Sequence, residues 1–257
     1  MDTGSLEYNV IVVKWGDKFT AEHVNRIYRM AKKNITLPFN FYCYTEDPIG
    51  IYNEVNIIPL DESLDLEKWW WKLTLFKENN WSEGVNLFLD LDVVIQKNID
   101  HLFSKAKSNK ITLIVDDSDW TEYIFHSSDP TTAPEYNSSI MIWYNNQNAE
   151  IYNKFVENAQ LYQKVYLGID RFFTYEIDEV KFSDIGEEEW YNRKNLFSNQ
   201  EIEDLKNESI TFPKIDENGR RIGTQSCRVF FDPNKSICIF NGCHEDHFYS
   251  GMENFLL

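Results

Sequence analysis

The sequence predicts one α/β domain built on a mostly parallel sheet. Short apolar, β-branched segments alternate with amphipathic segments over residues 1–115, which is typical of parallel strands joined by helical crossovers. The chain has 257 residues, of which 42% are hydrophobic, and this suffices for one large core. No internal repeat or low-complexity linker divides it. We therefore expect residues 1–8 to be an N-terminal tail or a cloning remnant, and residues 9–257 to form a single domain.

The first three strands follow from apolar runs that stop at turn residues. Val10–Trp15 is continuous and β-branched, as in a buried strand, and a Gly-Asp pair ends it. Phe39–Tyr44 stops before a turn that ends in proline, and Val55–Leu60 contains the proline that terminates it. In sheets of parallel strands, ligands gather at the carboxyl ends of the strands.

Three segments are predicted to be helical. Ala21–Asn34 has apolar residues at helical spacing with basic residues between them, and Ala149–Tyr166 has the pattern of one long amphipathic helix. Leu66–Glu78 carries three consecutive tryptophans, of which at least one must face the core. Further strands are predicted at Asn86–Leu91, Ile111–Val115, Ser139–Tyr144 and Ile237–Phe240; the chain after Asp178 is otherwise expected to be irregular.

The net charge of −17 disfavours a protein that grips a nucleic acid backbone. An acidic enzyme that handles anionic nucleotides must neutralise them locally, with a cation or with a few lysines and arginines. The sequence begins without the basic and apolar regions of a secretion signal, and no apolar stretch approaches the roughly 20 residues that cross a bilayer. We expect a cytoplasmic protein, in the host cytoplasm if the source is viral.

The four cysteines, Cys43, Cys227, Cys238 and Cys243, include no Cys-x-x-Cys pair. Reduced thiols of an intracellular protein are the simplest interpretation. A zinc site formed by Cys238 and Cys243 with His244 and His247 is an alternative, although the usual knuckle spacing is missing.

The triplet Asp90-Leu91-Asp92 follows an apolar strand directly. In an extended segment, residues two apart point to the same side, so both carboxylates would share one face. Two such carboxylates repel each other unless a cation lies between them, and oxygen ligands of this kind suit Mg²⁺ or Mn²⁺. A pair of solvated acids at the edge of a sheet is the simpler alternative.

A strand that ends in Asp-x-Asp is also how phosphatases of the haloacid dehalogenase type begin. Asp90 would then be the nucleophile and Asp92 the acid/base, while Asp116-Asp117 after Ile111–Val115 would imitate their later acidic pair. That family places its nucleophile near the N-terminus, whereas three predicted strands precede Asp90 here. The spacing from Asp92 to Asp116 is also short for the units that lie between the two motifs in that family.

The order of several motifs resembles that of GT-A glycosyltransferases, specifically small bacterial and viral relatives of glycosyltransferase family 8. The similarity covers roughly residues 9–175 and rests on Val10–Trp15, Trp70-Trp71-Lys72-Leu73, Asn86–Asp92, Ile99–Phe103, Tyr136–Met141, Gly168-Ile169-Asp170-Arg171 and Ile239–Gly242. The resemblance implies a Rossmann-like domain with helices on both faces of a mostly parallel sheet. It also implies a nucleotide-sugar-binding part at about 9–103 and an acceptor-binding part at about 104–257.

The resemblance also implies roles for individual residues. Asp90 would contact the donor ribose and the metal ion, Asp92 would ligate the metal, and Lys72 would meet the donor's phosphates or sugar. Asn137 and Ser138 would line the pocket for the sugar and the acceptor. The alternative for Lys72 is an ordinary surface lysine, and the alternative for Asn137 and Ser138 is that they simply begin a strand after a turn.

The remaining implied roles concern the reacting centre and the third metal ligand. Asp170 or Asp117 would orient or deprotonate the acceptor hydroxyl, and Arg171 would pair with a phosphate or a carboxylate; a helix cap is the alternative for Asp170. The family's third metal ligand is a histidine just before a glycine near the C-terminus. Here Asn241 stands at that place, so the ligand is either replaced or supplied by His244 or His247.

Taken together, the sequence predicts a transferase that uses a nucleoside-diphosphate sugar, with UDP favoured, and Mn²⁺ or Mg²⁺. The acceptor would be a glycan or another hydroxyl compound, and the similarity favours retention of configuration. Trp120 and Trp143 are candidate sugar-contacting rings. A non-catalytic module that binds nucleotide sugars is a further alternative, and the oligomeric state is left open.

Overall fold

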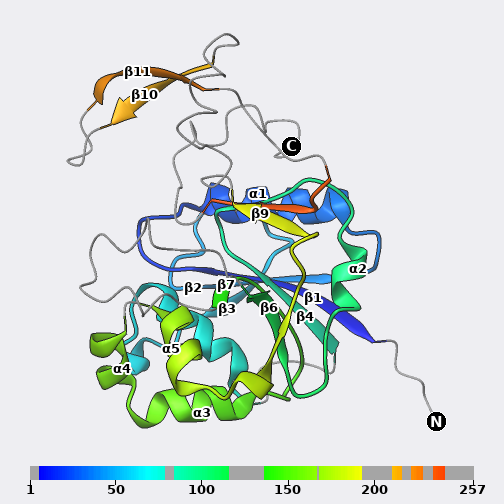
Figure 1. Cartoon of the computed structure of the whole chain (residues 1–257), viewed down its shortest axis with the longest axis vertical. Helices are drawn as coiled ribbons and strands as arrows, with labels where there is room; N and C mark the ends of the chain where they lie inside the picture. The colour runs from blue at the N-terminus through cyan, green and yellow to red at the C-terminus, as the bar shows by residue number, and fades with distance from the viewer. Residues whose placement is uncertain are drawn as a thin grey trace.

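The computed structural model describes residues 6–78, 84–115, 136–166, 168–192, 210–215, 221–227 and 234–240 (Figure 1). Its centre is a sheet of seven strands in the order β3-β2-β1-β4-β7-β6-β8. Their bounds are β1 Glu7–Lys14, β2 Asn40–Thr45, β3 Asn56–Pro59, β4 Gly84–Leu89, β6 Ile111–Val115, β7 Tyr136–Tyr144 and β8 Phe182–Asp184. Only β7 runs antiparallel to its neighbours β4 and β6 among these strands, which confirms the predicted mostly parallel sheet.

One face of the sheet is covered by α1 (Ala21–Asn34), by α2 (Asp100–Phe103) and by a small second sheet. That sheet has the order β5-β12-β9, formed by β5 (Val93–Ile95), β12 (Ile237–Ile239) and β9 (Trp190–Asn192). The core on this side includes Val10 and Val12 of β1 and Val24 and Ile27 of α1, all fully buried. Figure 1 shows α1 and β9 above the central sheet.

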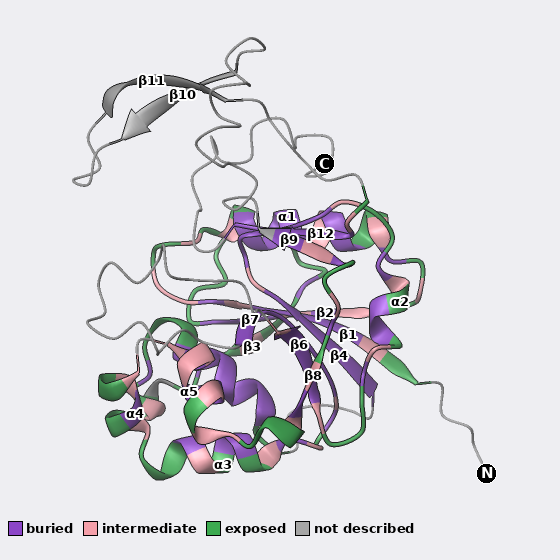
Figure 2. Cartoon of the chain, in the orientation of Figure 1, coloured by how far each residue is buried: buried purple, intermediate pink, exposed green. Residues whose placement is uncertain are grey.

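The opposite face is covered by η2 (Lys68–Phe76), α3 (Ala149–Glu157), α4 (Ala159–Val165) and α5 (Ile169–Glu176). Aromatic rings fill this second core: Trp70 stacks on Phe155 at 5.4 Å between ring centroids and meets Phe172 edge-on. Figure 2 shows the central strands buried between the two layers, with exposed residues on the outer sides of α3 and α4. Helices therefore lie on both faces, as predicted.

The remaining elements are short. They are the 3₁₀ turns η1 (Glu62–Leu64) and η5 (Glu179–Lys181), and a hairpin formed by β10 (Ile210–Ile215) and β11 (Arg221–Cys227). The prediction of an irregular chain after Asp178 was wrong for β8, β9, β10 and β11, because strands of three residues and a hairpin carry too little periodicity to be recognised.

Two predicted α-helices have a different form. Leu66–Glu78 is a 3₁₀ helix over Lys68–Phe76, and its three-residue period aligns Trp70, Leu73 and Phe76 on one side, although all residues from Trp70 to Phe76 are buried. The predicted helix Ala149–Tyr166 is broken at Asn158, where the backbone leaves the helical region (φ −144°, ψ 37°) before α4 begins. Asparagine favours such breaks because its side chain competes for backbone hydrogen bonds.

Buried asparagines link the strands at the end of the sheet where β1 begins. Asn9 of β1 donates from Nδ2 to Oδ1 of Asn86 on β4 (3.0 Å) and accepts at Oδ1 from Nδ2 of Asn40 on β2 (3.2 Å). Asn86 in turn donates to Asn145. Asn9 and Asn86 have no exposed surface, so these amides must bond to one another, and they fix the register of three neighbouring strands.

Replacing Asn9 by alanine should lower the free energy of unfolding by about 1–3 kcal/mol, because the fully buried Asn86 and the half-buried Asn40 would each lose a hydrogen bond. Urea unfolding followed by circular dichroism measures the change. Asn53→Ala, at an exposed position, is the matched control and should unfold like the wild type. Equal unfolding midpoints for the two variants would contradict a role for the amide network in stability.

Candidate active site

The acidic triplet forms a tight turn at the carboxyl end of β4. The backbone N–H of Asp90 donates to the carbonyl of Ser139 on β7 (2.9 Å), and the N–H of Val93 donates back to the carbonyl of Asp90 (3.3 Å). The expectation that Asp90 and Asp92 lie in an extended segment was therefore wrong. The strand ends at Leu89, one residue before the triplet, because the chain must reverse to enter β5.

This turn carries the chain from one face of the sheet to the other. Along β4, Phe88 packs into the core beneath η2, whereas Leu87 and Leu89 pack on the α1 side, so the alternation directs Asp90 toward η2. After the turn, Leu91 and the whole of β5 belong to the α1 side. The two aspartates therefore lie on either side of the turn at the carboxyl end of β4. Asp90 is partly exposed and Asp92 is buried, with 4% exposure.

Lys72 forms an ion pair with Asp90. Its Nζ lies 2.8 Å from Oδ1 and 2.9 Å from Oδ2 of the carboxylate, and it also donates to the hydroxyl of Ser138 (3.2 Å) and to the carbonyl of Ser138 (3.4 Å). The ammonium group lies 5.2 Å from the centroid of the Phe88 ring. Lys72 is therefore a fixed, buried cation, which excludes the interpretation as a surface lysine.

An irregularity in β7 turns Ser138 toward this ion pair. The register between β6 and β7 shifts, with Leu113 opposite Met141 but Ile114 opposite Asn137, so residues 138–140 have no partner on β6. The backbone of Ser138 is thus free to bond to Lys72 and Asp170, while Asn137 accepts the N–H of Ser139 at its own side chain (2.9 Å). Bulges commonly aim residues at sites in this manner.

Asp170 completes the cluster from the first turn of α5. Its Oδ1 accepts the backbone N–H of Ser138 at 2.9 Å. Burial raises the pKa of this carboxyl and the nearby Asp90 adds to the increase, against the opposing effects of Lys72 and of the hydrogen bonds from Ser138. Arg171, the next residue, is half-buried on the same helix and has no ion-pair partner within the described part of the chain.

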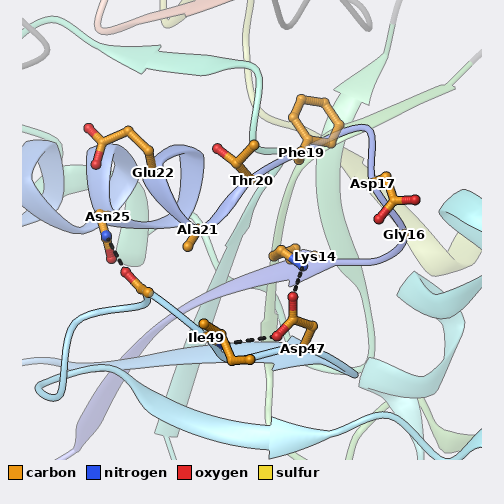
Figure 3. A pocket seen from close by; sticks show the side chains of 11 residues that line it. Lys14, Gly16, Asp17, Phe19, Thr20, Ala21, Glu22, Asn25, Asp47 and Ile49 are labelled. Atoms are coloured by element: carbon orange, nitrogen blue, oxygen red, sulfur yellow. Dashed lines mark hydrogen bonds and ion pairs between the residues drawn. The ribbon is translucent and has the colours of Figure 1, made fainter.

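A pocket of about 490 Å³ opens at the same edge of the sheet, on the α1 side (Figure 3). It lies between the turn after β1 and the turn after β2, and its walls include Lys14, Phe19 and Asp47. Lys14 ends β1, is 5% exposed, and lies 4.0 Å from Oδ2 of Asp47. Gly16, at φ +63°, lets its N–H reach Oε1 of Glu46 at 2.6 Å.

The pocket and the acidic turn are neighbours in the sheet. β1 pairs with β2 on one side, where Lys14 is opposite Thr45, and with β4 on the other, where Ile11 is opposite Phe88. Continuing the second register places Lys14 beside the acidic turn. The sequence singled out the turn and Lys72 but missed this pocket; the signal was a lone lysine at the end of a buried apolar strand, followed by a glycine.

The donor set at the turn fits a hard divalent cation. Asp90 and Asp92 offer carboxylate oxygens, which Mg²⁺ and Mn²⁺ prefer. Within the described ranges no three His, Cys, Asp or Glu side chains cluster as a complete metal site, so a third protein ligand has to come from the rest of the chain. His244, named as that ligand, and Asp117, named as a catalytic carboxylate, lie outside the described residues.

The proposed zinc ligands and the candidate sugar-contacting tryptophans lie either in the core or outside the described residues. Cys43 and Cys238 are buried thiols of the core, and burial raises the pKa of Cys43 to about 12. The other proposed zinc ligands, Cys243, His244 and His247, lie outside the described part. Trp143 is 1% exposed and packs edge-on against Phe76, so it is a core residue and cannot contact a sugar. Trp120 lies outside the described residues.

Solved glycosyltransferase structures share this fold. Two structures of the galactosyltransferase LgtC, one in complex with donor and acceptor sugar analogs and one of an active-site mutant, superpose with a TM-score of 0.58. They match over 96% of this chain and 93% of theirs at 11% identity. The glycosyltransferase GlyE of Streptococcus pneumoniae TIGR4 matches 70% of this chain and 45% of its own at 12% identity, with a TM-score of 0.51.

These similarities show that the chain has the GT-A glycosyltransferase fold, as predicted. No protein-family model and no curated protein sequence matches it, so membership of family 8 stays a prediction. The haloacid dehalogenase interpretation loses its topological basis, because Asp90 follows the fourth strand of a sheet with the glycosyltransferase arrangement. None of the helices in the described part is long and apolar enough to span a bilayer.

The raised pKa of Asp170 predicts a pH-dependent contribution to stability. Because the folded protein binds this proton more tightly than the unfolded chain does, the stabilisation is fully present below the ordinary pKa of 3.8 and is lost as the pH rises through the folded-state pKa. Asp170→Asn keeps an oxygen for the N–H of Ser138 but cannot ionise.

The melting temperature of Asp170→Asn relative to the wild type should therefore rise with pH across that interval and then level off. Thermal unfolding of both proteins between pH 3.5 and pH 8 provides the measurement, and Asp178→Asn, a variant of a carboxylate outside this cluster, serves as the control. A constant difference between Asp170→Asn and the wild type over the whole range would show that burial does not raise the pKa of Asp170.

Proposed function

We propose that this protein is a metal-dependent glycosyltransferase that moves a sugar from a nucleoside-diphosphate sugar, with UDP as the favoured nucleotide, to a hydroxyl group of a glycan-type acceptor. The observation that carries the proposal is the turn Asp90-Leu91-Asp92 with Lys72 fixed against it. Two carboxylates and one buried cation at the carboxyl ends of parallel strands form a site that suits a diphosphate and a divalent ion together.

The donor would extend across the edge of the sheet. The pocket beside Lys14 is large enough for a nucleoside, and Phe19 in its wall supplies an aromatic surface. The acidic turn lies on the next strand, so a diphosphate attached to that nucleoside would reach Asp90 and Asp92. Four acidic side chains lie at or beside the pocket: Asp17, Glu22, Glu46 and Asp47. Their negative charge disfavours a phosphate there, so we assign the pocket to the nucleoside end of the donor.

Sugar transfer breaks the bond between the sugar's anomeric carbon and the diphosphate oxygen, which keeps the electron pair. Asp90 and Asp92 would hold a divalent ion, which when bound would supply Lewis-acid stabilisation of that leaving group. Lys72 provides a second positive charge, and its four contacts keep it in place without reorganisation during the reaction. Arg171, on the helix turn beside Asp170, is assigned to the donor phosphate or to a carboxylate.

The acceptor hydroxyl forms the new bond to the anomeric carbon and must lose its proton. Asp170 is the carboxylate that we assign to orient this hydroxyl and accept the proton, with Asp117 as the other candidate. A raised pKa makes Asp170 a stronger base than an ordinary aspartate. Ser138, which contacts Lys72 and Asp170, and its neighbour Asn137, whose side chain accepts the N–H of Ser139, would line the sugar pocket.

The third metal ligand is proposed to come from the segment after β12. Ile239 pairs with Val93 in an antiparallel register, so Phe240 continues alongside Asp92. The chain enters residues 241–247 from this point, and these include His244 and His247. We assign His244 as the ligand because Asn241, at the position expected from the sequence similarity, offers a weaker amide oxygen.

Asp92→Asn should abolish metal-dependent activity, because the neutral amide loses the charge that holds the cation. The rate of Mn²⁺-dependent hydrolysis of UDP-galactose and UDP-glucose, monitored as the release of UDP, gives the measurement without requiring an acceptor. A decrease of at least about 100-fold in rate is expected, and Glu157→Gln, an exposed carboxylate on α3, should retain wild-type activity. Undiminished Mn²⁺-dependent hydrolysis in Asp92→Asn would contradict the proposal.

A further inference from the structure

Trp69 differs from the two tryptophans that follow it on η2. Trp70 and Trp71 are 4% and 3% exposed and belong to the core, whereas Trp69 is 42% exposed. A single exposed ring is common on protein surfaces, so the case for a function rests on the neighbours of Trp69. Lys68 lies over the ring, with Nζ 5.6 Å from the centroid, so a polar group already accompanies this exposed surface.

The 3₁₀ form of η2 aligns Trp69 with Lys72. In a 3₁₀ helix, residues three apart lie on the same side, about 6 Å apart along the axis, because each turn holds three residues with a rise of about 2 Å. Had this segment been the predicted α-helix, the two side chains would diverge by about 60°. Trp69 is thus one turn away from the cation that binds Asp90, on the same face of the helix.

Gly168 packs against the part of the ring around Nε1. A Cβ atom added to this glycine would lie 3.2 Å from Nε1 of Trp69, which shows that the indole rests against the bare backbone there. Gly168 precedes α5, and two residues later Asp170 bonds to Ser138. Its φ of 170° suits any residue, so the requirement for glycine is one of space. The ring therefore lies between the elements that supply Lys72 and Asp170.

We infer that Trp69 is the platform on which the acceptor's sugar ring stacks. The inference deepens the proposed function and rests on it. A pyranose has an apolar face of C–H groups and a polar rim of hydroxyls, and an exposed indole beside a carboxylate and an ammonium group complements both parts. The face of the sugar lies on Trp69 while a rim hydroxyl points toward Asp170.

The position of the ring distinguishes the acceptor from the donor nucleoside. The nucleoside pocket is built from the α1 side of the sheet, with Phe19 as its ring, whereas Trp69 lies with η2 and α5 on the opposite side. A donor that crosses the edge at the acidic turn has its base on one side, and an acceptor that approaches Asp170 comes from the other. Trp69 accordingly recognises a carbohydrate acceptor.

An array of immobilised oligosaccharides, probed with the protein in the presence of Mn²⁺ and UDP, tests the inference. The wild type should bind a defined subset of glycans, and Trp69→Ala should bind the same subset at least about tenfold more weakly, with Trp69→Phe intermediate. Gly168→Ala, which displaces the ring, should weaken binding in the same direction. Tyr175→Ala, which removes another exposed ring on α5, should not.

Calorimetric binding of UDP with Mn²⁺ to each variant separates the two proposals. Unchanged UDP binding by Trp69→Ala together with weakened glycan binding supports the acceptor platform. If the wild type binds UDP with Mn²⁺ but no glycan, or if Trp69→Ala binds glycans as the wild type does, the inference is overturned and the proposed function stands. Equal losses of UDP and glycan binding in Trp69→Ala would show a purely structural ring, whereas no UDP binding by the wild type overturns both.

Discussion

The ion pair between Lys72 and Asp90 joins the parts of the chain on which the site depends. Lys72 comes from η2, Asp90 from the end of β4, and the contacts of Lys72 with Ser138 extend the pair to β7 and, through Asp170, to α5. The two side chains are 10% and 24% exposed, so each charge requires the other. Removing one partner of a buried pair typically costs about 3–5 kcal/mol, which makes the pair a constraint on how these four elements meet.

Under the proposed function, the same pair resolves an electrostatic difficulty of this chain. A protein with a net charge of −17 repels nucleotides unless positive charge is concentrated where they bind. Lys14 at the end of β1 and Lys72 on η2 are both buried near the carboxyl ends of the central strands, and each lies beside an aspartate. A divalent cation at the acidic turn would complete this local reversal of charge. The site thus depends on a few fixed cations within an acidic surface.

The sequence predicted the mostly parallel sheet, because apolar periodicity is a local signal. It also pointed to the triplet Asp90-Leu91-Asp92, because carboxylates follow a strand there, and to Lys72 through the family resemblance; the structure places Lys72 against Asp90. It could not predict the features that bring the site together. The 3₁₀ helix η2 packs on α3 through Trp70 and Phe155, and the bulge that turns Ser138 toward Lys72 lies where β7 pairs with β6. Both are tertiary effects. Nothing in the sequence distinguishes the exposed Trp69 from the buried Trp70 and Trp71.

The central claim is that the turn binds a nucleoside diphosphate through a divalent cation, and thermal unfolding with a panel of nucleotides tests it most directly. UDP with Mn²⁺ should raise the melting temperature of the wild type, whereas UDP with a chelator, or Mn²⁺ alone, should raise it far less, because a ligand that binds only the folded state stabilises it. The same mixture should leave the melting temperature of Asp92→Asn unchanged. Equal stabilisation of both proteins, or none of the wild type by any nucleoside diphosphate with Mn²⁺, would contradict the account.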